Sequence, residues 1–216
     1  MTSPKILILF CLIFLPLYLN AKTNESKSYI IVVALESEIP NANLEKYAPI
    51  VYTGVGKVNA AIKLYEAILK YKPELVINYG TAGSLKNKAG LFRVNTFIQR
   101  DMDVRALGFS RGVTPFANEK LPKIEGIVLG TGDSFVTNPK KQLEGLNVDL
   151  DLVDMEGFAL NKVCEYLNIE FHSYKNVSDT ANDDAANDWE KNAAKGAKTF
   201  KNLLEKKYGI SNLLIK

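Results

Sequence analysis

The sequence predicts an α/β fold in which helices cover a mostly parallel sheet. Short apolar runs rich in β-branched residues alternate with segments whose apolar residues follow helical spacing, which is the pattern of β-α-β units. The chain has 216 residues, of which 47% are hydrophobic and 24% are charged. A chain of this size and composition can bury a full core without disulfides or a structural metal, and disorder or a coiled coil is excluded.

The first half of the chain contains two predicted strands with a helix between them. Residues 29–35 are β-branched and apolar throughout, which is typical of a strand covered on both faces. Residues 75–79 predict another buried strand. Between Lys57 and Pro73 the apolar residues recur at helical spacing, at Val58, Ala61, Ile62, Tyr65, Ile68 and Leu69.

The second half repeats this alternation. The predicted elements are a compact strand over 126–130, a helix over 155–167, a strand over 170–177 and a long helix over 189–207. Asn187 and Glu190 resemble a capping box at the start of the last helix, with Asn in place of Ser or Thr.

Charge and the scarcity of cysteine and histidine exclude several classes of function. The net charge of +3 is small and evenly distributed, so neither nucleic acid nor an anionic membrane is an expected partner. Cys11, Cys164 and a single histidine, His172, are too few for a Cys/His zinc site. His172 lies in a strand-like run without a nucleophile motif, which argues against a catalytic triad. We expect Cys164, in a helical pattern, to be a buried apolar residue.

Residues 1–21 resemble a secretory signal. Lys5 precedes the apolar run 6–19, and Ala21 is a small residue at the expected cleavage site. The run is shorter than the roughly 20 residues that a membrane-spanning helix needs, and Pro16 interrupts it. We therefore predict a cleaved signal over 1–21, one domain over 22–216, no stable membrane insertion after cleavage, and a periplasmic or secreted location. A buried first strand, an uncleaved anchor and a cytoplasmic location are the alternatives.

Acidic and glycine-rich segments follow the predicted strands. Ligands of open α/β sheets bind beyond the carboxyl ends of the strands, so these segments form the candidate site. Each segment taken alone also has a simpler interpretation. Glu36 and Glu38 could be solvated loop charges, Asp133 a turn residue and Glu156 an acid in the first turn of a helix. Their joint placement favours a single ligand-binding rim. The segments are Glu36 with Glu38, Gly80–Gly83, Gly132–Phe135, Asp154–Glu156 and Ser178–Asp179.

A rim of carboxylates suits a reaction catalysed by proton transfer through a cationic transition state. Cleavage of a glycosidic bond is such a reaction, because one carboxyl group protonates the leaving group and another orients or deprotonates the nucleophile. The glycine turn at residues 54–57 lacks the G-x-x-x-x-G-K-[ST] pattern of a phosphate-binding loop, so we interpret it as a close-packing turn.

Seven short segments, in order, resemble one family. Residues 34–38 resemble A-M-E-x-E, residues 53–61 resemble S-G-I-G-K-V-N-A-A and residues 78–83 resemble N-T-G-S-A-G. The others are 101–104 with Gly108-Phe109, 132–136, 153–156 and 177–181. Together they resemble the nucleoside phosphorylase and nucleosidase superfamily, and within it the 5′-methylthioadenosine/S-adenosylhomocysteine nucleosidases. The resemblance spans about 29–204 and implies a mixed, mostly parallel central sheet flanked by helices, as in nucleoside phosphorylases.

The resemblance implies roles for the polar residues of the rim. Asp179 would protonate N7 of the purine, with support from Ser178. Glu38 would activate the water that attacks the anomeric carbon. Glu156 would bind the 2′ and 3′ hydroxyls of the ribose beside Met155.

The same resemblance implies how the base is held. Phe135 would stack on the purine and the backbone of Val136 would read the adenine edge, while Thr81, where the family has a serine, belongs to the substrate-binding residues. Asp179 must keep a proton near neutral pH, and burial against Phe135 with other carboxylates nearby would raise its pKa.

Water is the expected nucleophile. Phosphorylases of this superfamily carry Gly-Asp-Pro and a following Arg after the first strand, where this chain has 36-ESE-38, and a carboxylate repels phosphate. The resemblance implies hydrolysis of adenine nucleosides such as 5′-methylthioadenosine or S-adenosylhomocysteine, with no cofactor and no metal. A purine nucleoside phosphorylase and an exported, non-catalytic nucleoside-binding protein are the alternatives.

Several departures from the family fall near the substrate. The segment between Glu38 and Tyr52 and the segment 93–100 are shorter than usual, Asp154 replaces a glutamate and Asn182 replaces an aspartate. Because these changes alter the surroundings of the 5′ group of the substrate, the sequence does not predict which 5′ substituent binds. Family members pair as homodimers in which the neighbour closes the 5′ pocket, and residues 109–116 occupy the corresponding stretch, so we expect a homodimer.

Overall fold

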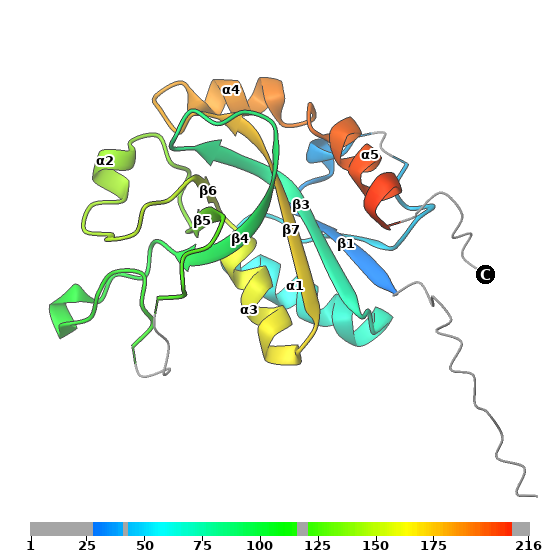
Figure 1. Cartoon of the computed structure of the whole chain (residues 1–216), viewed down its shortest axis with the longest axis horizontal. Helices are drawn as coiled ribbons and strands as arrows, with labels where there is room; N and C mark the ends of the chain where they lie inside the picture. Colours follow the sequence, from blue (N-terminus) through cyan, green and yellow to red (C-terminus); the bar gives the residue numbers. More distant parts are fainter. Residues whose placement is uncertain (1–27, 41–42, 116–120, 209–216) are drawn as a thin grey trace, which may run out of the picture.

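The computed structural model describes residues 28–40, 43–115 and 121–208. The predicted signal over 1–21, including Cys11, lies outside them. Within the described residues, seven strands form one sheet in the order β2-β1-β3-β6-β5-β4-β7, and β7 also pairs with β3 (Figure 1). The strands are β1 Tyr29–Val33, β2 Ile50–Tyr52, β3 Leu75–Ser84, β4 Leu91–Gln99, β5 Ile127–Thr131, β6 Leu152–Asp154 and β7 Glu170–Asp179.

Most neighbouring strands are parallel. β1 runs parallel to β2 and β3, β3 to β7, β4 to β5, and β5 to β6. Only the pairs β3–β6 and β4–β7 are antiparallel among the described strands. Because β7 pairs with both β3 and β4, the strands β3, β6, β5, β4 and β7 close on themselves. The predicted mixed, mostly parallel sheet is therefore confirmed.

Helices cover both faces of this sheet (Figure 1). α1 and α3 pack on one face against residues such as Val32 and Val76, while α5 packs on the other face, where Phe200 contacts the cluster that contains Ile31. All five residues of β1 are buried, as expected for a doubly covered strand. The helices are α1 Lys57–Tyr71, α2 Pro139–Gln142, α3 Gly157–Leu167, α4 Ala185–Asn192 and α5 Ala197–Tyr208, with 3-10 turns at Glu36–Glu38 and Arg105–Leu107.

Two predicted strand ends were wrong in a way that matters for the site. β3 continues to Ser84 and β7 to Asp179, so residues 80–83 and 178–179 lie within strands instead of following them. The glycines do not stop β3 because β7 continues to pair with it, with a register shift between Ala82 and Gly83. The backbone groups of this glycine-rich segment thus keep partners in the sheet.

The predicted long helix over 189–207 was also wrong. Two helices, α4 and α5, are separated by a turn over residues 193–196. Gly196 approaches β3 and β7 so closely that a Cβ atom there would lie 2.4 Å from both Asn176 Cγ and Tyr79 Oη. The predicted capping box fails as well, because Asn187 lies inside α4, whose N-cap is Asp184.

α1 forms where it was predicted, but most of the apolar residues that predicted it face outward. Val58 is 67% exposed and Leu69 is 59% exposed, whereas the core-facing residues are Ala60, Leu64, Ala67 and Ile68. An exposed apolar stripe therefore runs along α1 through Val58, Ile62, Tyr65 and Leu69. No helix within the described ranges is both long and apolar enough to cross a bilayer.

Candidate active site

A cavity of about 200 Å³ opens where the carboxyl ends of β1, β3, β6 and β7 meet. Its wall contains side chains from segments that are far apart in the sequence, including the 3-10 turn after β1 and α4. The eight residues that the resemblance predicts to be catalytic or substrate-binding all line this cavity: Glu38, Thr81, Phe135, Val136, Met155, Glu156, Ser178 and Asp179. Glu36 and Asp133, from the same predicted rim, do not line it.

Glu38 is buried at the end of the 3-10 turn that follows β1, while Glu36 in the same turn is exposed. Its Oε2 accepts a hydrogen bond from the N–H of Leu35 at 3.1 Å. Its Oε1 accepts from both the N–H of Thr81, at 2.7 Å, and the hydroxyl of Thr81, at 2.8 Å. Three donors from two elements therefore hold the carboxylate in one orientation.

Glu156 is buried at the N-terminal end of α3. Its Oε1 accepts a hydrogen bond from the N–H of Gly56 at 2.9 Å. The glycine turn at 54–57, which we interpreted as a packing turn, thus also holds a predicted site residue. Burial, together with the charge of nearby Asp154, raises the pKa of Glu156 from 4.5 to about 7.

Asp179 ends β7 and is buried as well. Its Oδ1 accepts from the N–H of Ala181 at 2.9 Å and its Oδ2 accepts from the hydroxyl of Ser178 at 2.8 Å. Burial raises the pKa of Asp179 and outweighs these two hydrogen bonds, which lower it. A Cβ atom on Gly83 would lie 2.7 Å from Asp179 Oδ1, so the glycine makes room for the carboxyl group.

Two predicted residues of the base pocket lie on the segment after β5. Phe135 is 40% exposed at the cavity, and Val136 is buried. Gln142 of α2 braces this segment, because its side chain donates to the carbonyl of Phe135 at 2.8 Å and accepts from the N–H of Thr137 at 2.9 Å.

Lys175 is a buried cation that the sequence analysis missed. Its Nζ lies 2.8 Å from Asp154 Oδ2, and the carboxylates of Asp154 and Glu156 raise the pKa of the ammonium group although burial lowers it. A Cβ atom on Gly80 would lie 3.1 Å from Lys175 Nζ and 3.5 Å from Glu38 Oε1. Because Gly80 in the middle of β3 has no side chain, the ammonium group of Lys175 has room beside Asp154 and Glu38.

Arg100 was also missed. It is 1% exposed, lines the cavity and donates to the carbonyls of Gly132 and Ser134 and to the hydroxyl of Ser134. Burial lowers the pKa of its guanidinium although acidic residues nearby raise it. These three Arg100 hydrogen bonds hold the turn that leads into Phe135.

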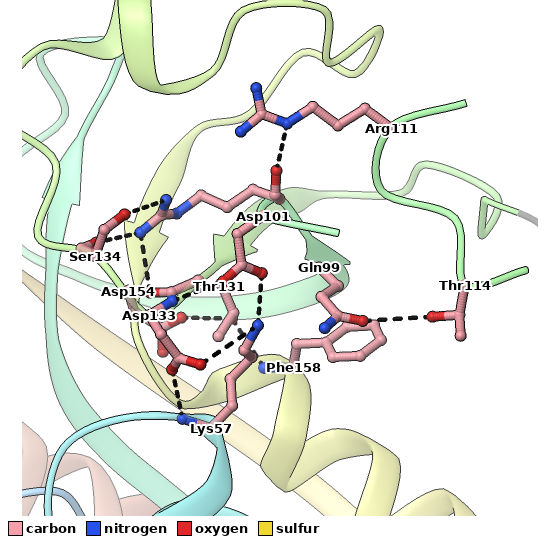
Figure 2. A network of polar contacts seen from close by, with 12 residues as sticks. Lys57, Gln99, Asp101, Arg111, Thr114, Thr131, Asp133, Ser134, Asp154 and Phe158 are labelled. Atoms are coloured by element: carbon pink, nitrogen blue, oxygen red, sulfur yellow. Dashed lines mark hydrogen bonds and ion pairs between the residues drawn. The ribbon is translucent and has the colours of Figure 1, made fainter. Parts of the chain in front are cut away.

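An ion-pair network joins the same turn to the start of α1. Figure 2 shows Lys57 reaching both Asp101 and Asp133, at N–O distances of 2.6 and 3.6 Å. Asp133, interpreted as a turn residue, also accepts the N–H of Lys57 at 2.8 Å and is exposed. Its role in the structure is to cap α1, outside the cavity wall. Among the described residues, no group of three or more His, Cys, Asp or Glu side chains could hold a metal ion.

Trp189 of α4 also lines the cavity. Its indole N–H donates to the hydroxyl of Thr81 at 3.0 Å. The sequence analysis had noted this residue only as the start of a helix.

Comparison with known proteins places this arrangement in a family. Residues 43–206 match the profile of the phosphorylase superfamily. The chain belongs to this superfamily. Its fold is accordingly the nucleoside phosphorylase-like α/β fold that the resemblance implied.

Relatives within the superfamily are nucleosidases by name. The chain is 30% identical to the 5′-methylthioadenosine/S-adenosylhomocysteine nucleosidase of Bacillus subtilis over 188 residues, which cover 69% of this chain and 81% of that protein. It is 32% identical to the enzyme of the same name from an Exiguobacterium species over 161 residues, covering 63% and 69% of the two chains.

Solved structures of superfamily members share the fold. The nucleosidase of the same name from Colwellia psychrerythraea, in complex with adenine, superposes with a TM-score of 0.75 at 22% identity over 86% of this chain and 96% of that chain. Futalosine hydrolase from Helicobacter pylori gives a TM-score of 0.71 at 21% identity over 83% of this chain and 96% of that chain.

Proposed function

We propose that this protein hydrolyses the N-glycosidic bond of adenine nucleosides with a 5′-thio substituent, such as 5′-methylthioadenosine or S-adenosylhomocysteine, and releases adenine. The observation that carries the proposal is that three buried carboxyl groups, those of Glu38, Glu156 and Asp179, line one cavity. Membership of the superfamily and the names of the relatives support the choice of an adenine nucleoside.

Asp179 is the proposed general acid. Breaking the bond between C1′ and N9 leaves the bonding electron pair on adenine, and protonation at N7 neutralises the leaving base. The raised pKa of Asp179 keeps its carboxyl group protonated to a higher pH than that of a solvated aspartate, as an acid requires. Ser178 orients the carboxyl group by its hydrogen bond to Oδ2.

Glu38 is the proposed base. A water molecule attacks C1′, the new C–O bond forms as the C–N bond breaks, and Glu38 takes the proton of the water. Thr81 holds the Glu38 carboxylate through two hydrogen bonds. Glu156, beside Met155, binds the 2′ and 3′ hydroxyls of the ribose, and these contacts strengthen as the sugar becomes oxocarbenium-like.

The segment after β5 is the proposed site of the base. Phe135 lines the cavity with an exposed aromatic ring on which a purine can stack, and the backbone of Val136 presents the polar groups that would read the adenine edge.

Water, and not phosphate, is the proposed nucleophile. Among the described residues that line the cavity, Arg100 is the one cation, and it donates to the carbonyls of Gly132 and Ser134. Lys175, which is not among the residues that line the cavity, is paired with Asp154. Both cations are therefore engaged, while Glu38 and Glu156 would repel a phosphate dianion.

The test is release of adenine from 5′-methylthioadenosine by the purified chain, with and without inorganic phosphate. We expect release at the same rate in both conditions. Release that depends on phosphate would favour a purine nucleoside phosphorylase, and binding without release would favour a non-catalytic nucleoside-binding protein. Either result would contradict the proposed hydrolase.

A homodimer is part of the proposal. The exposed apolar stripe on α1, with Ile62 53% and Tyr65 43% exposed, is the kind of surface that a second subunit covers. We expect Ile62→Glu to shift the chain toward the monomer in sedimentation velocity, with Tyr166→Glu, 83% exposed on α3, as the control. A wild-type protein that sediments as a monomer would contradict the dimer.

The signal over 1–21, the single domain over 22–216 and the export of the mature chain stay predictions. N-terminal sequencing of the protein recovered from fractionated cells tests them, with a start near Lys22 as the expected result.

A further inference from the structure

We propose that Trp189 is a positioning residue for the candidate base Glu38 and acts through the hydroxyl of Thr81. This inference rests on the proposed function, because it concerns how the base of that reaction is held.

The hydrogen bonds around Thr81 have one consistent direction. An indole N–H can only donate, so the hydroxyl oxygen of Thr81 accepts from Trp189 at 3.0 Å. A hydroxyl group carries one proton, and that of Thr81 lies 2.8 Å from Glu38 Oε1, where the carboxylate can only accept. Trp189 therefore fixes the rotation of the hydroxyl so that its proton is directed at Glu38.

α4 holds the indole in place through a second contact with the sheet. Asn192, three residues after Trp189 and on the same side of the helix, donates to the carbonyl of Ser178 at 2.7 Å. α4 is thus tied to β3 through Trp189 and to β7 through Asn192. The helix bridges the strand that positions the candidate base and the strand that carries the candidate acid, Asp179.

The chemical consequence is an ordered carboxylate. Loss of the indole N–H frees the Thr81 hydroxyl to rotate away from Glu38, while the N–H of Thr81 and that of Leu35 still hold the carboxylate. Trp189→Phe keeps an aromatic ring at the cavity and removes the N–H donor, together with part of the indole ring system. We expect kcat to fall by about 3- to 10-fold, the size of one hydrogen bond, with KM for the nucleoside changed by less than about twofold.

The contact itself can be tested without substrate, because Trp189 is the single tryptophan of the chain. We expect Thr81→Val, which removes the hydroxyl, to change the fluorescence emission of the full-length protein. Thr81→Ser, which keeps a hydroxyl, is expected to retain the wild-type emission. Far-UV circular dichroism verifies that both variants are folded. Identical emission from folded Thr81→Val and wild-type protein would overturn the hydrogen bond between Trp189 and Thr81 on which the proposal rests.

A double-mutant cycle tests the positioning role. If Trp189 acts through the Thr81 hydroxyl, Trp189→Phe combined with Thr81→Val lowers kcat no further than Thr81→Val alone. A role of Trp189 as a pocket wall only would give multiplicative losses in kcat, or a loss confined to KM, and either result would overturn the proposal. If Thr81→Val does not fold, the cycle is run with Thr81→Ala.

The failure of this inference is distinguishable from failure of the proposed function. Wild-type protein that releases no adenine would overturn the proposed hydrolase and, with it, the positioning of a base. Active wild-type enzyme whose Trp189→Phe variant keeps the full kcat would overturn the inference alone.

Discussion

Lys175 and Asp154 form an ion pair of 2.8 Å whose side chains are only 2% and 1% exposed. Asp154 Oδ1 also accepts from the hydroxyl of Thr131 at 2.5 Å, as drawn in Figure 2, and its Oδ2 accepts from the N–H of Gly157 at 2.8 Å. The charges of Glu156 and Glu38 also act on the Lys175 ammonium group, so one buried cation interacts with three carboxyl groups. Lys175 of β7 thus joins these carboxyl groups into one polar cluster.

Removal of this cation is expected to destabilise the fold strongly. Lys175→Met leaves the charge of Asp154 buried without its partner, which costs about 3–5 kcal/mol in the free energy of unfolding. Urea unfolding measures this loss, and Lys175→Met with Asp154→Asn should recover part of it. Lys63→Met, which breaks an exposed pair with Glu66, is the control and should cost less than about 1 kcal/mol. Equal losses from the two single variants would contradict the importance of the buried pair.

Glu156 makes stability depend on pH. Its pKa is raised from 4.5 to about 7, so between these values the folded state binds more protons than the unfolded chain. The stability contributed by this group therefore falls as pH rises through this window, by up to about 3 kcal/mol. Glu156→Gln removes the titrating group. Denaturant unfolding at pH 5 and pH 8 should show a smaller decrease for the variant than for the wild type, and parallel decreases would contradict the assignment.

Gly83 is expected to be intolerant of any side chain. A Cβ atom there would lie 2.7 Å from Asp179 Oδ1 and 3.2 Å from Val153, so Gly83→Ala must displace the candidate acid. We expect kcat to fall by at least about tenfold, which corresponds to a rise of about 1.4 kcal/mol in the activation free energy, because the acid is moved from its place. Gly90→Ala, where a Cβ meets nothing within 4 Å, is the control. It should lose about 1 kcal/mol of stability through its positive φ and keep its kcat. Full activity in Gly83→Ala would contradict the placement of Asp179.

The sequence predicted the fold class and the convergence of the acidic residues because both depend on local signals. The first strand was predicted from an unbroken apolar, β-branched run over 29–35, and the helix beginning at Lys57 from helical spacing of apolar residues. The motif resemblance located Glu38, Glu156 and Asp179. The short strand β2 was missed, because three residues carry no readable period.

The remaining site residues depend on tertiary contacts. Lys175 resembles any strand residue in the sequence, and only the pairing of β7 with β3 brings it under Gly80 and beside Asp154. Trp189 belongs to a helix whose start was predicted too late, so its position at the cavity could not be predicted from spacing. The outward stripe of α1 was misleading because two of the four residues that α1 buries in the core, Ala60 and Ala67, are small, so the larger apolar residues on the outer face dominated the pattern.

The proposed reaction depends on a proton delivered to the purine by Asp179. Adenine release from 5′-methylthioadenosine, measured for wild type and Asp179→Asn together with binding of the same nucleoside by calorimetry, tests it most directly. We expect the variant to lose at least about 10²-fold in kcat, the usual contribution of a general acid, and to bind the nucleoside with little change in Kd. An Asp179→Asn variant that releases adenine at the wild-type rate would contradict the account.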